Sequence, residues 1–250
     1  MVGWENSFPA EMFGTSVSAQ AYIKHEIARF NISKTPESVE ELRAGGYGAE
    51  IESLQAIKPH AIVTTNYDQM LEIIFPDLVP VVGQSILQGA QLSTGEIFKI
   101  HGSVENYNGL VFTRSDYETF VSKKKYLSAK LLTFFSEHPL IFVGYIASDP
   151  NIQSILSDID EALPVKGGVI PNVYILEFNE GISGSSSPAR ERIIQTGDDR
   201  SVRVKLIEAR EFGLVFDAFA ANPALNDVNS KALRALLARS YNLVRHDILE

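Results

Sequence analysis

Residues 61–68 read Ala-Ile-Val-Thr-Thr-Asn-Tyr-Asp, an apolar run that becomes polar within a few positions. A short β-branched run of this kind is typical of a strand that is buried on both faces of a parallel sheet. Other runs along the chain have the same character, and helical patterns lie between many of them. The predicted strands are 61–65, 78–82, 97–101, 110–112, 140–145, 173–178 and 202–207. Strands that alternate with helices predict a Rossmann-like, doubly wound α/β fold with a mostly parallel sheet.

The helical patterns complete this prediction. We expect helices at 19–30, 47–58, 67–75, 125–136, 151–163, 190–195, 210–221 and 230–245. Residues 181–187 and 196–201 are expected to be surface loops, because they are rich in small and polar residues. The chain shows no internal repeat and no clear boundary, so residues 1–250 are predicted to form a single domain.

Composition excludes several classes of function. The sequence has no cysteine, which excludes disulfides, cysteine-ligated zinc and a cysteine nucleophile. The formal net charge of −9 argues against direct nucleic-acid binding, which needs clustered basic residues. The sequence has no apolar run of about 18 residues and no secretory signal, so we expect a cytoplasmic protein that does not enter membranes.

Three of the predicted strands end in residues that could carry chemistry, and the first two of these ends are at residues 66–68 and 101. In an open parallel sheet, ligands bind beyond the carboxyl ends of the strands. Asn66 and Asp68 follow the first strand, and the alternative interpretation is that one of them caps a helix. His101 ends a second strand and is followed by Gly102. It could act as a general base, or it could be a core histidine bonded to a backbone carbonyl.

The third strand end is Gly144-Tyr145, and a polar segment with Asp149 and Pro150 follows it. This composition predicts the start of a helix, where free backbone N–H groups can bind an anion. A plain turn between a strand and a helix is the alternative. The three strand ends together are more specific than any one of them.

The combination resembles the sirtuin fold, and most closely the sirtuin-like NAD-hydrolase domains of bacterial anti-phage defence systems. The resemblance covers about residues 45–220, and residues 110–117 are similar to the same branch. The segments that carry it are Thr64-Thr65-Asn66-Tyr67-Asp68, Lys99-Ile100-His101-Gly102-Ser103, Gly144-Tyr145 and Asp149-Pro150-Asn151-Ile152.

The resemblance implies that NAD is the substrate and that no metal is needed. By this resemblance, Asn66 contacts the nicotinamide ribose and the attacking water, and His101 is the catalytic base. Asp68 holds the carboxamide of nicotinamide, and Thr65 lies against the same pocket. The remaining binding residues implied by the resemblance are Gly144 and Tyr145 near the ribose and phosphates, and Glu177 with Phe178 and Asn179 at the adenosine end.

The sequence departs from the sirtuin pattern in two ways. The zinc module of sirtuin deacylases, which needs four cysteines, is missing, and this favours hydrolysis of the dinucleotide over protein deacylation. The family's N-terminal strand and its glycine-rich phosphate loop, Gly-Ala-Gly-x-Ser, are also missing from this sequence. We expect this loop either to be lost or to lie upstream of Met1. A smaller departure is Ile146, where a small polar residue is expected.

Three functions are consistent with these residues. The leading hypothesis is an NAD⁺ glycohydrolase that yields nicotinamide and ADP-ribose and acts as an effector of phage defence. The alternative is a catalytically weak or inactive module that binds NAD or ADP-ribose within a larger defence assembly. A protein deacylase or ADP-ribosyltransferase is the third. We also expect a homo-oligomer and a sensor or partner protein from a defence system.

Overall fold

The computed structural model describes residues 8–14, 17–83, 95–120, 138–144, 150–162, 168–184, 186–197 and 200–221. These residues divide into two compact units. The first unit comprises Met1–Phe120 and Phe216–Glu250, and the second comprises Val121–Val215. Each unit is described by itself.

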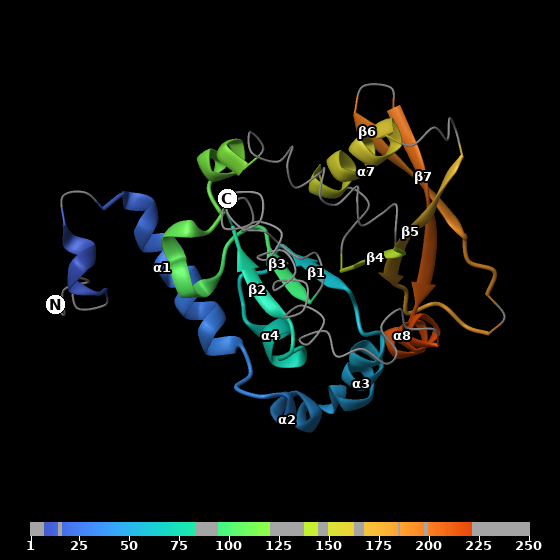
Figure 1. Ribbon diagram of the computed structural model, residues 1–250, viewed down its shortest axis with the longest axis horizontal. Helices are drawn as coiled ribbons and strands as arrows, with labels where there is room; N and C mark the ends of the chain where they lie inside the picture. The colour runs from blue at the N-terminus through green and yellow to red at the C-terminus, as the bar shows by residue number, and fades with distance from the viewer. Residues whose placement is uncertain are drawn as a thin grey trace, which may run out of the picture. The chain divides into compact units, whose positions relative to one another are not determined.

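The sheet of the first unit has three parallel strands in the order β1-β3-β2 (Figure 1). They are β1 (Ala61–Thr64), β2 (Val79–Val82) and β3 (Glu96–Lys99). Every residue of the central strand β3 is buried. The register pairs Lys99 with Thr64 on one side and with Val82 on the other. The three carboxyl ends therefore lie at one edge of the sheet.

Short helices surround this sheet. They are η2 (Ala10–Phe13), α1 (Ala19–Lys34), α2 (Val39–Leu42), the π-helical turn η3 (Arg43–Tyr47), α3 (Gly48–Ala56), α4 (Met70–Ile74) and η4 (Val104–Gly109). Residues 114–120 are also helical. Ile51 of α3 and Ile74 of α4 form one core cluster with Ile97 of β3. Removal of this apolar surface from water holds α3 and α4 against the sheet.

A second cluster joins α1 to η4. Ala28 of α1 packs with Val104 and Leu110, and the half-buried ring of Tyr67 packs against them. Figure 1 shows α1 in blue beside the green segment that contains η4. This contact attaches α1 to the loops that follow β1 and β3.

The second unit has a four-stranded sheet in the order β4-β5-β7-β6. Its strands are β4 (Leu140–Val143), β5 (Val169–Phe178), β6 (Glu191–Gly197) and β7 (Arg200–Ala209). The pairs β4–β5 and β5–β7 are parallel, whereas β6 is an antiparallel edge strand. Helix α7 (Pro150–Ala162) buries Leu156 and Ile159 completely. Helix α8 (Phe212–Ala220) begins in this unit and continues into the first.

The predicted α/β class with mostly parallel strands is confirmed, and two elements were predicted wrongly. Residues 110–112 form no strand. Their backbone N–H groups bond to nearby turns instead of a neighbouring strand: Leu110 N donates to Tyr107 O, and Val111 N donates to His101 O. Residues 190–195 were expected to be helical, but β6 begins at Glu191. Its pairing with β7 supplies the backbone hydrogen bonds that a helix would otherwise make.

Several boundaries also differ. The expected loop at 196–201 is narrower, since β6 reaches Gly197 and β7 begins at Arg200. The helices predicted at 125–136 and 230–245 lie outside the described residues. Among the described residues, no helix has the length and apolar character needed to cross a membrane.

Candidate functional site

The loops that follow β1 and β3 lie side by side at the carboxyl edge of the first sheet. Ile100 N donates to Thr64 O at 3.0 Å, and Val104 N donates to Tyr67 O at 3.0 Å. These two bonds continue the strand pairing beyond the sheet, so they bring the segment of Asn66 next to the turn of His101. The structure therefore places two of the three predicted strand ends together.

The β1 loop presents one exposed amide and one carboxylate that accepts a backbone hydrogen bond. The side chain of Asn66 is exposed, and its backbone N donates to Thr64 Oγ1 at 3.0 Å. Thr65, also predicted to line the pocket, is partly buried beside it. Asp68 Oδ1 accepts from Met70 N at 2.9 Å, an Asx turn that leads into α4. Asp68 thus shapes the approach to α4, but the N-cap position is Gln69, so neither Asn66 nor Asp68 is the cap that the alternative interpretation named.

His101 lies in a turn just beyond β3 and is only 3% exposed. Its imidazole meets two aromatic rings edge-on: the ring centroid of Tyr117 is at 5.5 Å and that of Phe120 at 4.9 Å. Its carbonyl oxygen accepts from Val111 N at 2.9 Å. The burial is that of a core histidine, and the rings of Tyr117 and Phe120 pack against the imidazole.

Gly102 is required by the turn that holds His101. Its φ of +98° lies in a region that side chains other than glycine rarely adopt, and a Cβ there would lie 2.7 Å from Gly109 O. The backbone of the 102–109 segment therefore closes tightly on itself. This close approach explains why glycine follows His101.

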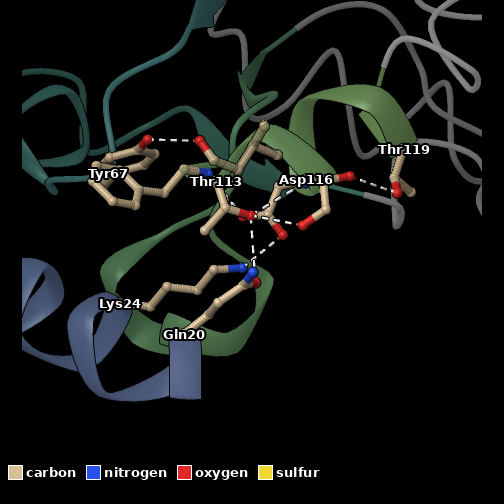
Figure 2. Close-up of polar contacts among 9 residues, drawn as sticks. Gln20, Lys24, Tyr67, Thr113, Asp116 and Thr119 are labelled. Carbon is tan, nitrogen blue, oxygen red and sulfur yellow. Dashed lines mark hydrogen bonds and ion pairs between the residues drawn. The ribbon is translucent and has the colours of Figure 1, made fainter. Parts of the chain in front are cut away.

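The helical segment at residues 114–120 carries the two rings that flank His101, and a charged network fixes its start. Thr113 N donates to Asp116 Oδ2 at 2.7 Å, and Asp116 N donates back to Thr113 Oγ1 at 3.3 Å. This reciprocal pair is a capping box. Lys24 Nζ reaches from α1 to Asp116 Oδ1 at 2.8 Å (Figure 2).

The Asp116 carboxylate is stabilised as an anion. Partial burial by itself raises the pKa of Asp116, but hydrogen bonds from Lys24, Thr113 and Phe112 outweigh that effect and lower the pKa to about 2. The Lys24 side chain is only 7% exposed. The pair therefore joins α1 to the segment behind His101 through a largely buried charge.

Tyr67 connects the β1 loop to the same region. Its hydroxyl donates to Val111 O at 2.8 Å, a contact also drawn in Figure 2. Burial, together with the nearby Tyr117 and Asp116, raises the pKa of Tyr67 to about 12. The hydroxyl therefore stays protonated and remains a donor near neutral pH.

The other predicted site residues belong to the second unit. Gly144 ends β4 with φ +76° and an exposed backbone, and Tyr145 lies outside the described residues. Glu177 Oε1 accepts from Arg192 Nη1, an ion pair between β5 and β6. The predicted contact of Glu177 with adenosine stays a prediction, and this carboxylate already has a cationic partner.

Sequence reasoning missed a buried lysine beneath the β1 loop. Lys99 is 0% exposed, and its Nζ lies 2.6 Å from Glu72 Oε1 of α4. It also donates to the backbone carbonyl oxygen of Asp68. The signal was present in the sequence, because Lys99 is a cation in the apolar run Ile97-Phe98-Lys99-Ile100.

The SIR2-like domain family matches residues 60–197, more than half of the chain. The chain belongs to the SIR2-like family. The matched span begins next to β1 and includes both site loops, β4 and β5. The predicted sirtuin resemblance is therefore confirmed at the level of the family.

Curated relatives agree with this assignment. The SIR2-like chain is 32% identical over 106 residues to a protein of Enterococcus faecium named NAD(+) hydrolase ThsA, covering 38% of this chain and 21% of that protein. A protein of the same name from Bacillus cereus (strain MSX-D12) is 30% identical over 112 residues, covering 41% and 23% of the two chains. The matched region spans about a fifth of the length of these relatives.

We predict that Gly102→Ala destabilises the chain far more than Gly46→Ala. The two glycines have nearly the same φ, +98° and +93°, but a Cβ at Gly46 meets no atom within 4 Å. The free energy of unfolding should fall by about 1 kcal/mol for Gly46→Ala and by about 3 kcal/mol for Gly102→Ala. Urea denaturation measures both, and equal losses would contradict the tight closure of this turn.

We predict that Asp116→Asn destabilises more than Lys24→Met. The first leaves a buried ammonium without its anion and should cost on the order of 2 kcal/mol, whereas the second leaves a carboxylate that Thr113 still binds. The Asp116 pKa is depressed from 3.8 to about 2, so its stabilisation is complete above pH 4 and is lost as pH falls through 2. Urea midpoints from pH 7 to pH 2 should show wild type and Asp116→Asn converging, and a constant difference would refute the assignment.

Proposed function

We propose that the chain carries an NAD⁺ glycohydrolase site at the carboxyl edge of its first sheet. The observation that carries the proposal is the backbone pairing that joins the Asn66 loop to the His101 turn at this edge. Two facts support it: the SIR2-like assignment of the chain, and relatives that are named as NAD(+) hydrolases.

The chemistry requires little more than placement of groups. The bond between C1′ of the ribose and the nicotinamide nitrogen breaks, a water adds to C1′, and nicotinamide, ADP-ribose and a proton result. Nicotinamide is a good leaving group, so the protein needs to hold the ring, exclude bulk water and direct one water molecule. Asn66 is exposed and can orient that water, Asp68 binds the carboxamide, and His101 serves as the base near the ribose hydroxyls.

The same proposal extends to substrate and biological role. NAD⁺ is the substrate and no metal takes part in the reaction. Because the sequence has no cysteine, it cannot build a four-cysteine zinc module, and this favours hydrolysis over deacylation. We propose an effector in phage defence, in which loss of NAD⁺ stops the infected cell. In this role the chain would act in the cytoplasm as a homo-oligomer, with a sensor or partner protein.

A second candidate is a module that binds NAD⁺ or ADP-ribose without cleaving it. The burial of His101 behind Tyr117 and Phe120 favours it, because a base must reach the ribose before it can act.

We predict that Asn66→Ala and His101→Ala each lower the rate of NAD⁺ cleavage by at least about 100-fold. Each removes a group that acts on the ribose or its water. Asn108→Ala removes an exposed asparagine of η4 and should leave the rate unchanged. Chromatography of NAD⁺, nicotinamide and ADP-ribose provides the measurement.

The same proteins separate the two candidates. Calorimetry with NAD⁺ that shows binding by the wild type, together with no release of nicotinamide, would establish the binding module instead. Undiminished cleavage in both Asn66→Ala and His101→Ala would overturn the proposed site.

A further inference from the structure

Lys99 is a cation at the centre of the first sheet. It is the last residue of β3, is 0% exposed, and has parallel strands on both sides. An ammonium in such a place loses its hydration, and that loss is large unless partners replace the water. Because side chains alternate along a strand, Lys99 shares a face with Ile97, which packs in the cluster of α3 and α4.

The partners of Lys99 lie in two different parts of the chain. One is the carboxylate of Glu72 in α4, at 2.6 Å. The other is the backbone carbonyl oxygen of Asp68, in the loop between β1 and α4. Glu72 is 19% exposed, and its second oxygen is buried with no hydrogen-bond partner among the described residues. The ion pair is therefore incompletely satisfied on the side of Glu72.

A buried ion pair of this kind adds little to the free energy of unfolding. Replacing a buried pair by apolar residues of similar volume is often neutral or stabilising. What an apolar residue cannot replace is the hydrogen bond to Asp68 O. That bond ends in the loop that presents Asn66 and the Asp68 carboxylate. The loop is also held to the η4 segment, because Val104 N donates to Tyr67 O and Gln69 Nε2 donates to Glu105 Oε1 at 3.0 Å, whereas the bond from Lys99 comes from β3.

We infer that Lys99 is a positioning residue. It holds the 65–69 loop in the position in which Asn66 and Asp68 can contact a dinucleotide. The inference rests on the proposed function for its catalytic consequence but not for its structural one. The Glu72 carboxylate neutralises the Lys99 ammonium and orients it, and the backbone carbonyl oxygen of Asp68 accepts a hydrogen bond from it. Loss of the lysine then frees the loop while the sheet remains intact.

The decisive comparison uses two variants that both remove the ion pair. Lys99→Met/Glu72→Leu removes both charges and the hydrogen bond to Asp68 O. Glu72→Gln removes only the anion, so Lys99 can still donate to Asp68 O and to the new amide oxygen. The single variant Lys99→Met leaves Glu72 buried without a cation and should melt at a lower temperature than the double variant.

Two readouts are needed, and one is independent of activity. Amide hydrogen exchange of the peptide covering residues 65–70 reports the order of the loop, and thermal unfolding reports the fold. In the folded double variant we expect this exchange to be faster by about tenfold or more, and in Glu72→Gln to stay near wild type. We expect kcat for NAD⁺ cleavage to fall by about tenfold or more in the double variant, with little change in KM.

The outcomes separate the inference from the proposed function. A wild-type chain that neither binds nor cleaves NAD⁺ would end the proposed function, while faster exchange in the double variant would still support the role of Lys99 in the loop. Unchanged exchange in a folded double variant would overturn the inference. So would faster exchange with undiminished kcat, or equal exchange in the double variant and Glu72→Gln.

Discussion

Parallel pairing of β1 with β3 is the constraint on which the candidate site depends. The register sets Thr64 beside Lys99, and the hydrogen bond from Ile100 N to Thr64 O extends the pairing past both strands. A shift by one residue would turn every side chain of β3 to the other face of the sheet. Lys99 would then lose Glu72, and Ile97 would leave its core cluster. One register therefore serves the core and the site together.

Around this edge a polar network adds to the apolar cluster that joins α1 to η4. The Lys24–Asp116 pair joins α1 to the segment that carries Tyr117 and Phe120, and those rings pack against His101. A charge network of this kind is directional, so it fixes the position of the short segment more narrowly than apolar contact would. The segment that packs against His101 is thus held by a capping box and by an ion pair to α1.

Much of this arrangement could be predicted from residue patterns, and the failures have physical causes. The strand predicted at 61–65 matches β1 to within one residue, whereas the strand predicted at 97–101 ends at Lys99 and leaves His101 in a turn. Apolar runs ending in polar residues are local signals that locate a strand better than its last residue. Residues 190–195 are predicted as a helix from their local pattern, but antiparallel pairing with β7 makes them an edge strand. The helical segment at 114–120 was missed, although Thr113 and Asp116 have the spacing of a capping box. The roles of Asn66, His101 and Glu177 stay predictions.

The sequence by itself determined the α/β class, the SIR2-like kinship and the identity of the two site loops. All three follow from residue types and spacings that act locally or are shared with relatives. Only the tertiary structure decided that His101 packs against two aromatic rings and that Lys99 lies under the Asn66 loop. The reason is physical. Burial and these contacts depend on residues distant in the chain, and the pattern of a strand does not reveal which distant group a charged residue such as Lys99 will contact.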